Sequence, residues 1–207
     1  MSILQIFPTQ VGLYTFPESD RIQLPDSSIF FTNDISNSSS LHKEYHGQSL
    51  LEEQSFSYLA NFILESSRHF LVNTFGCTNQ IFISNSWLNV GNAVSTQDLH
   101  NHSNSTISGT FYLSFDPDSH PGIVFKNPRS TGSFSCVEDF PILSTPFNSS
   151  FYKPSYNELD LLLWPSYLDH GFFPLINPLS SHKHRISLSF NVGIESTLLH
   201  PYKVTCS

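Results

Sequence analysis

The sequence predicts a mainly β fold with flanking helices and a jelly-roll-like double sheet as its core. After Gly76 the chain is a series of short apolar or alternating segments, separated by turn-forming residues and without an intervening helix. One longer segment before Gly76 has apolar residues at helical spacing. The composition, 39% hydrophobic and 13% charged in 207 residues, can build one packed core. We therefore expect one domain over residues 1–207, with strands and a helix in residues 1–76 and the jelly-roll core from about residue 80 to residue 195.

The first 32 residues contain three short extended segments punctuated by Pro8, Pro17 and Pro25. Because proline cannot donate a hydrogen bond within a sheet, we expect these segments to form edge strands. Their sequences are LQIF, VGLYTF and SIFFT. A polar loop rich in Ser and Asn follows them.

The segment from Ser49 to Gly76 has the spacing of an amphipathic helix. Apolar residues recur at intervals of three to five or seven positions, at Leu51, Phe56, Leu59, Phe62, Ile63 and Phe70. Glycine readily takes the left-handed conformation that ends helices, so Gly76 is the predicted stop. We expect one helix or two, packed on the outside of the sheet.

The remaining strands follow in order, each bounded by turn residues. Residues 80–90 alternate, and the stretch from His100 to Leu113 opens with two histidines and closes with an apolar run. Three further strand-like segments are GIVFKNPR, LDLLLWPS and RISLSFNVGI. Turn sequences such as DPDSHPG connect them.

Charge and cysteine content exclude several classes of protein. A net charge of -8 without a cluster of Lys or Arg argues against nucleic acid as a partner. Cys77, Cys136 and Cys206 are odd in number and widely spaced, which favours reduced thiols over a disulfide framework. The N-terminus lacks signal-peptide features, and no apolar run approaches the length of about 18 residues needed to span a membrane. We expect a soluble, cytoplasmic protein without a membrane partner.

Three histidines are the candidate metal ligands. Side chains alternate along a strand, so His100 and His102 are expected on one face at the mouth of the strand that follows them. His170 follows a buried-looking strand and a proline. Three neutral imidazoles meeting at a barrel mouth would form a metal site with open positions for water, cosubstrate or oxygen, and iron(II) is the metal we expect first.

A candidate anion site lies on a later strand. Arg185 and Ser187 alternate onto one face, opposite Ile186, Leu188 and Phe190. An arginine inside an apolar barrel requires an anion, and its planar fork fits a carboxylate. A dicarboxylate such as 2-oxoglutarate could bridge from Arg185 to the metal.

These residues, in this order, resemble the iron(II)- and 2-oxoglutarate-dependent dioxygenases of the prolyl-hydroxylase-like branch. They are more closely similar to a group of superfamily members found in bacteria and phages. The similar segments are SWLN, HNHSNSTISGTFYL, GIVFKNPR, LLLWPSYLDH and HRISLSFNV. The resemblance implies a double-stranded β-helix, or cupin-like, core in which His100, His102 and His170 are the catalytic iron ligands.

The same resemblance assigns a binding site for the cosubstrate 2-oxoglutarate. Arg185 and Ser187 would anchor its distal carboxylate, with the Tyr112 hydroxyl as a second donor, and Asn89 and Trp87 would line the pocket. The implied reaction is hydroxylation by O2, with release of succinate and CO2. The substrate is not identified, and a prolyl or other peptidyl side chain is the nearest analogy.

One position departs from the family pattern, because most members carry His-x-Asp or His-x-Glu where this chain has His102. Three explanations stay open at this point. His102 is itself the third ligand, Asp98 supplies a carboxylate instead, or water takes the third position and His102 contacts the substrate.

Two other functions are consistent with the sequence. A cupin-type three-histidine dioxygenase would use Arg185 for its substrate's own carboxylate and would not need 2-oxoglutarate. A non-catalytic β-sandwich would carry the histidines without a metal. The remaining histidines in polar segments are expected on the surface: His120, His182, His184 and His200. The oligomeric state does not follow from the sequence.

Overall fold

The computed structural model describes residues 8–24, 41–43, 50–129, 149–176, 178–179 and 184–195. The expected strands LQIF and SIFFT, the Ser/Asn-rich loop, Cys136, Cys206, His182 and His200 lie outside these residues.

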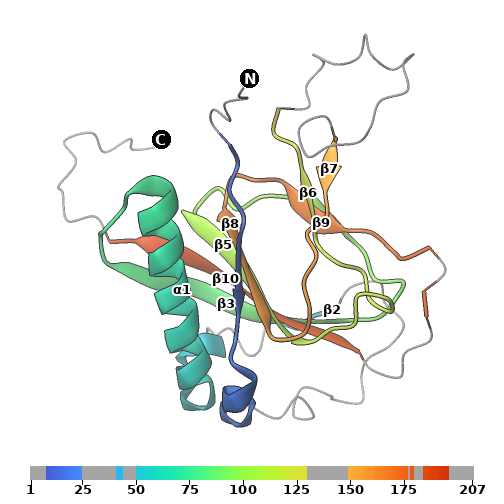
Figure 1. The fold of residues 1–207 in the computed structure, drawn as a ribbon, viewed down its shortest axis with the longest axis horizontal. Coiled ribbons are helices and arrows are strands. Elements are labelled where there is room, and N and C mark those ends of the chain that lie inside the picture. The colour runs from blue at the N-terminus through green and yellow to red at the C-terminus, as the bar shows by residue number, and fades with distance from the viewer. Residues whose placement is uncertain are drawn as a thin grey trace, which may run out of the picture.

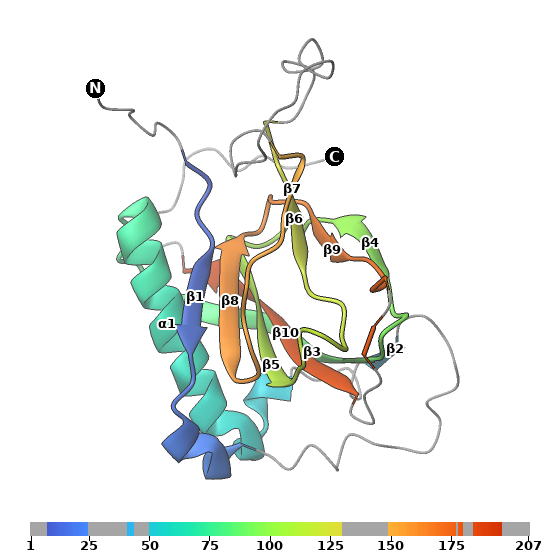
Figure 2. The same ribbon diagram turned by 45° about the vertical axis from the view of Figure 1, so that its right-hand side comes forward.

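Two antiparallel sheets face each other across the middle of the molecule (Figures 1 and 2). The larger sheet has the order β1-β8-β5-β10-β3-β2 and the smaller one the order β4-β9-β6-β7. The larger sheet consists of β1 (Gly12–Thr15), β2 (Leu41–Lys43), β3 (Ile81–Gly91), β5 (Ile107–Ser114), β8 (Asp160–Pro165) and β10 (Arg185–Ile194). The smaller sheet consists of β4 (Gln97–His100), β6 (Val124–Lys126), β7 (Phe151–Tyr152) and β9 (His170–Phe172). This arrangement confirms the predicted mainly β class.

The predicted helix is α1 (Ser57–Phe75), which two short 3-10 turns precede, η3 (Leu50–Glu52) and η4 (Gln54–Phe56). A further 3-10 helix, η1 (Glu18–Gln23), follows β1. Gly76 has a φ of 63° and its N–H bonds to the Val72 carbonyl, which ends α1 where the sequence predicted. Among the described residues, no helix combines the length and apolar composition that a membrane crossing requires.

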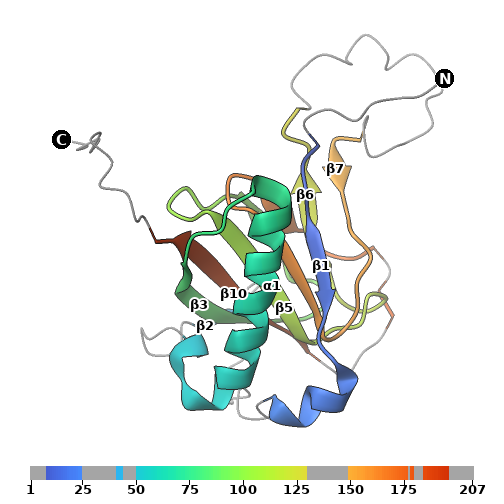
Figure 3. The ribbon, with the colours of Figure 1, turned by 60° about the vertical axis from the view of Figure 1, so that its left-hand side comes forward.

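Alternation along the strands divides the interior into two parts. Helix α1 covers the outer face of the larger sheet (Figure 3), where it packs against one set of strand residues. That set includes Phe111, Leu161, Leu163, Ile186, Leu188 and Phe190. The opposite face of the same strands turns toward the smaller sheet and carries a second cluster around Tyr112, Leu162 and Trp164. Burying each large apolar side chain contributes about 1.5–3 kcal/mol, so the outer layer is the main source of stability.

The His-x-His pair does not open the strand that ends near Leu113, and this expectation was wrong. His100 ends β4 in the smaller sheet, whereas β5 begins at Ile107 in the larger sheet. The intervening residues are polar and turn-forming, and they carry the chain from one sheet to the other. The His102 N–H donates to the Ser166 carbonyl at 2.9 Å, which fixes this crossing loop against the end of β8.

Candidate metal centre

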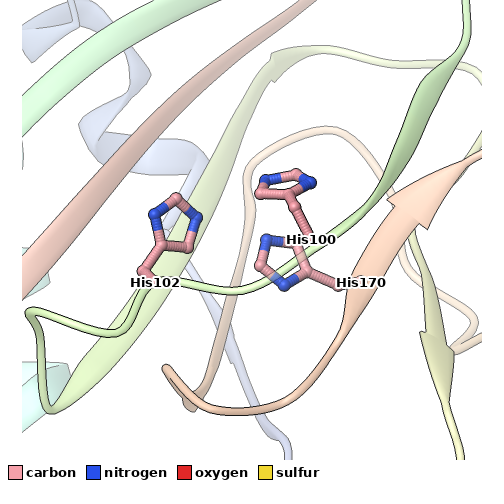
Figure 4. A group of neighbouring side chains, drawn as sticks. All are labelled: His100, His102 and His170. Carbon is pink, nitrogen blue, oxygen red and sulfur yellow. The ribbon is translucent and has the colours of Figure 1, made fainter.

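The three predicted histidines meet at one point (Figure 4). In the pairing of β4 with β9, His100 lies opposite His170. His102 reaches the same point from the crossing loop, and one ring nitrogen of each histidine lies within 4.8 Å of the others. Among the residues that the structure describes, no other group of three His, Cys, Asp or Glu side chains is placed to hold a metal ion.

Gly171, directly after His170, allows this close approach. A Cβ atom there would lie 2.6 Å from the Gln97 carbonyl oxygen and 3.0 Å from that of Asp98. Both contacts are with backbone atoms, so any side chain would push β4 away from β9. The glycine therefore keeps His100 and His170 adjacent.

Hydrogen bonds fix the orientation of two imidazoles. Nδ1 of His100 lies 2.9 Å from the Asp98 carbonyl oxygen, and Nδ1 of His170 lies 2.9 Å from that of Leu168. A carbonyl only accepts, so each Nδ1 carries the hydrogen and each Nε2 keeps a free lone pair. This is the arrangement in which a histidine can bind a metal through Nε2.

His102 is held by a buried polar network. Its Nδ1 lies 3.5 Å from the Asn191 amide nitrogen, and the other amide atom of Asn191 accepts a hydrogen bond from the Ser108 hydroxyl at 2.7 Å. Ser108 also lies 2.8 Å from the Ser166 hydroxyl. If the side-chain amide of Asn191 is turned by 180°, its oxygen accepts a hydrogen bond from Nδ1–H of His102. All three histidines then carry their hydrogen on Nδ1.

The electrostatics of the cluster favour neutral imidazoles. Burial lowers the pKa of His170 to about 4. The neighbouring His100 and His102 lower this pKa further, whereas the hydrogen bond to the Leu168 carbonyl and the charge of Asp169 raise it. Burial, and then His100, also lowers the pKa of His102. Near neutral pH both rings therefore carry a free lone pair, as ligation to a metal requires.

Asp98, the alternative carboxylate ligand, does not belong to the cluster. Its side chain is exposed, and it takes part through its backbone carbonyl, which orients His100. Three neutral nitrogen donors without a carboxylate fit a divalent transition metal such as Fe(II).

Arg185 is buried, and none of the described residues provides it with an anionic partner. Arg185 is the first residue of β10, and only 3% of its surface is exposed. Nη1 donates to the Pro121 carbonyl at 3.0 Å, and the guanidinium lies 3.9 Å from the centre of the Phe172 ring. Within the described part of the chain, Nε has no hydrogen-bond partner and no carboxylate forms an ion pair with the guanidinium. Burial lowers the pKa of Arg185, an unfavourable state that a bound anion would relieve.

The cluster and Arg185 line the same cavity. Every predicted site residue lines it: His100, His102, His170, Tyr112, Arg185, Ser187, Asn89 and Trp87. The cavity thus contains a buried guanidinium, which fits a carboxylate, and three imidazoles, which fit a metal ion.

Several residues of the site did not emerge from the sequence. Trp164 lines the cavity, and its buried Nε1 has no hydrogen-bond partner in the part of the chain that the structure describes. Phe172 stacks on Arg185. Asn191 has the same strand parity as Arg185, so alternation along β10 could have identified it. Tyr156, which bonds to Tyr112, lies in a Pro-containing loop that carries no periodic signal.

His120 is buried, contrary to the expectation from its polar sequence neighbours. His120 was expected on the surface, but it is only 1% exposed. Its Nδ1 accepts a hydrogen bond from the Asp116 backbone N–H at 3.0 Å, within the turn DPDSHPG. The turn folds over His120 and buries it. The polar residues next to it in the sequence do not indicate this burial.

Comparisons with known proteins agree with this geometry. The family model described as "Putative 2OG-Fe(II) oxygenase", where 2OG is 2-oxoglutarate, matches residues 85–191, a little over half of the chain. No curated protein matches. The structure is similar to that of HygX from Streptomyces hygroscopicus with nickel and 2-oxoglutarate bound, at 14% identity and a TM-score of 0.58, covering 90% of this chain and 83% of HygX.

AviO1 from Streptomyces viridochromogenes Tue57 has a TM-score of 0.58 at 9% identity, covering 89% of this chain and 90% of AviO1. At such low identities these likenesses show the fold, a double-stranded β-helix, and confirm the predicted architecture. The match of the family model adds the enzyme class, with Fe(II) as the metal and 2-oxoglutarate as the cosubstrate. The chain therefore belongs to the 2OG-Fe(II) oxygenase family.

Proposed function

We propose that this oxygenase hydroxylates its substrate at a three-histidine iron site, with Arg185 as the anchor of 2-oxoglutarate. The observation that carries the proposal is a buried guanidinium in the same cavity as three imidazoles, with no anionic partner among the residues that the structure describes. Removing a charge from water is costly unless an opposite charge accompanies it. The distal carboxylate of 2-oxoglutarate supplies that charge.

His100, His102 and His170 hold the metal through Nε2 in this proposal. The Asp98 and Leu168 carbonyls keep Nδ1 of two rings protonated, and Asn191 holds the third ring. We favour His102 over Asp98 as the third ligand because the Asp98 carboxylate is exposed and outside the cluster. A site with water in the third position stays as the alternative that a metal titration must exclude.

Ser187 and Tyr112 flank Arg185 and complete the site for the distal carboxylate. Both line the cavity, and they face each other in the pairing of β5 with β10. When bound, iron(II) and 2-oxoglutarate would supply the means to use O2 as the oxidant. One oxygen atom would enter a C–H group of the substrate as hydroxyl, and the other would enter succinate as the cosubstrate loses CO2. The chain orients both reactants, and Trp164 and Phe172 shield the cavity from water.

One part of the cavity wall is polar. Asn89 donates to the Ser189 hydroxyl at 2.9 Å, and Ser189 donates to Thr110 at 3.3 Å, so a row of polar groups crosses β3, β10 and β5. Such a wall favours a substrate with several hydrogen-bonding groups near the reacting carbon. A peptidyl side chain, including proline, stays a prediction from the resemblance. A cytoplasmic location and a single domain stay predictions as well.

The test separates the metal from the cosubstrate. Isothermal calorimetry of 2-oxoglutarate binding to anaerobic Fe(II)-loaded protein would be compared for wild type, Arg185→Ala and His170→Ala, with metal content measured for each. Truncating one side of a buried charge pair costs about 2 kcal/mol or more, so Arg185→Ala should weaken binding at least about 30-fold and keep the iron. His170→Ala should lose the iron itself. Arg21→Ala, which removes an exposed arginine, is the matched control and should change neither quantity.

Succinate formation distinguishes the rival functions. We expect the wild-type protein to release succinate from 2-oxoglutarate in an oxygen-dependent reaction, and we expect His170→Ala to release none. A cupin-type enzyme would turn over without the cosubstrate and form no succinate. Unchanged 2-oxoglutarate affinity in Arg185→Ala would contradict the division of roles.

A further inference from the structure

Tyr156 lies behind the cavity and bonds to one of the residues that line it. Its hydroxyl is 2.8 Å from the Tyr112 hydroxyl, and the two ring centres are 4.5 Å apart. Both residues are buried, with 4% and 3% of their surfaces exposed, but Tyr112 lines the cavity and Tyr156 does not. The Ile123 backbone N–H lies 2.8 Å from the Tyr156 oxygen.

The direction of the hydrogen bonds follows from what each group can do. An amide N–H only donates, so the Tyr156 oxygen accepts from Ile123. The hydroxyl hydrogen of Tyr156 then needs an acceptor, and the described residues supply one in the Tyr112 oxygen. A buried hydroxyl hydrogen without an acceptor would be costly. Tyr112 thus receives a hydrogen bond from Tyr156 and keeps its own hydrogen for another partner.

We propose that Tyr156 is a positioning residue that makes Tyr112 a donor toward the cavity, where the distal carboxylate of 2-oxoglutarate accepts its hydrogen. The inference rests on the proposed function, since it requires that carboxylate beside Arg185. The chain of donors runs from Ile123 N–H through Tyr156 and Tyr112 to the carboxylate. Each hydroxyl in such a chain strengthens the next as a donor.

The loop that carries Tyr156 is fixed to the strand that carries Tyr112. The Leu159 N–H donates to the Tyr112 carbonyl at 2.8 Å, and Leu159 has a φ of 69°, which is rare for a residue with a branched side chain. The Asn157 N–H donates to the Asp160 carboxylate at 2.7 Å. Residues held in such a conformation need support from their surroundings. The two hydroxyls are therefore in place before any ligand arrives.

Burial keeps both hydroxyls protonated near neutral pH. It raises the pKa of Tyr112 from its usual value and raises that of Tyr156 well above it, although the nearby Arg185 charge opposes both shifts. Arg185 and Tyr112 line the same cavity, and Tyr156 bonds to Tyr112. Donors and cation together favour a carboxylate over a neutral end group.

The test is a double-mutant cycle of 2-oxoglutarate affinity, measured by calorimetry on nickel(II)-loaded protein so that no turnover occurs. Tyr112→Phe should raise the Kd about tenfold or more, because it removes a hydrogen bond to a charged group. Tyr156→Phe should raise the Kd about three- to tenfold, because Tyr112 is free to turn its hydrogen away. The double variant should be no weaker than Tyr112→Phe alone, since Tyr156 acts through Tyr112.

The controls separate the two proposals. Tyr58→Phe, which removes an exposed hydroxyl bonded to Asp20, should leave the Kd unchanged. If Arg185→Ala binds 2-oxoglutarate as wild type does, the proposed function is wrong. If Arg185→Ala loses affinity while Tyr156→Phe keeps it, or the two tyrosine effects multiply in the double variant, only the role of Tyr156 is wrong.

A measurement on the wild-type protein covers the case in which Tyr156→Phe does not fold. In NMR spectra of tyrosine-labelled protein, 2-oxoglutarate should move the Tyr112 hydroxyl hydrogen downfield and leave that of Tyr156 nearly in place. A Tyr112 hydroxyl signal that does not respond to 2-oxoglutarate would overturn the inference.

Discussion

The two faces of β10 are almost equally inaccessible to water, yet they are chemically opposite. Ile186 and Leu188 belong to the core cluster that includes the apolar residues of α1, and they are at most 1% exposed. Arg185 and Ser187 face the cavity and are each 3% exposed. Apolar groups are stabilised by burial alone, whereas a buried cation requires a partner. A polar face that is buried but incompletely paired therefore marks the place where a ligand completes the structure.

The largest expected effect is a difference in stability between variants of two adjacent residues, one on each face of β10. Leu188→Ala should lower the free energy of unfolding by about 2–5 kcal/mol, because it leaves a cavity in the core. Ser187→Ala should cost less than about 1 kcal/mol but weaken 2-oxoglutarate binding about two- to tenfold. Urea denaturation and calorimetry of both variants check this. Equal losses of stability would mean that the cavity face is part of the core.

Low pH should reduce the free energy of unfolding of the metal-free protein, because His170 in the cavity becomes protonated. The pKa of His170 is about 4 in the folded chain, below the usual 6.5, so the folded state binds its proton less readily than the unfolded state does. Stability present above pH 6.5 is then lost as the pH falls toward 4, by up to about 3 kcal/mol. Denaturation in a chelator at several pH values should show this loss, and His170→Gln should reduce it. A variant with the same pH dependence as wild type would contradict the prediction.

Two glycines offer a smaller and more selective contrast. Gly171→Ala should weaken metal binding about tenfold or more, since the added Cβ separates β4 from β9 and displaces His100 from His170. Gly76→Ala meets no atom within 4 Å but has to adopt a φ of 63°. It should cost about 1 kcal/mol of stability and leave the metal affinity unchanged. Metal titration and thermal unfolding of both variants test the pair, and equal metal affinities would refute it.

The smallest effect concerns the ring of His102. Asn191→Ala removes the partner of its Nδ1 and should reduce metal affinity by about tenfold, the lower end of what such supporting hydrogen bonds contribute. Asn73→Ala, on the exposed side of α1, is the control. A competition assay with a fluorescent chelator measures both. Wild-type affinity in Asn191→Ala would show that the packing of Trp87 beside His102 is enough to orient the ring.

Much of the fold follows from local rules. Alternation along β10 separates Arg185 from Ile186, and the spacing before Gly76 defines α1. The short strands of the smaller sheet are different, because β4 and β9 have four and three residues and exist through their pairing with each other. That pairing, rather than a shared strand, brings His100 to His170.

The parts of the site that escaped prediction have a common physical reason. Tyr156, Trp164 and Phe172 act through contacts between segments far apart in the sequence. The residues next to them in the sequence do not indicate these contacts. The three histidines and Arg185 could be predicted because a metal and a carboxylate each require particular side chains. Tyr112, Asn89 and Trp87 were assigned only from the resemblance to a family. Chemistry constrains the ligands more tightly than it constrains the residues that support them.

The most direct test of the central claim is the anaerobic iron(II) affinity of wild type, His102→Ala and Asp98→Ala. Three imidazoles around one ion predict one tight site in wild type, a loss of about 100-fold or more in His102→Ala, and no change in Asp98→Ala. Wild-type affinity in His102→Ala, or its loss in Asp98→Ala, would contradict the three-histidine centre.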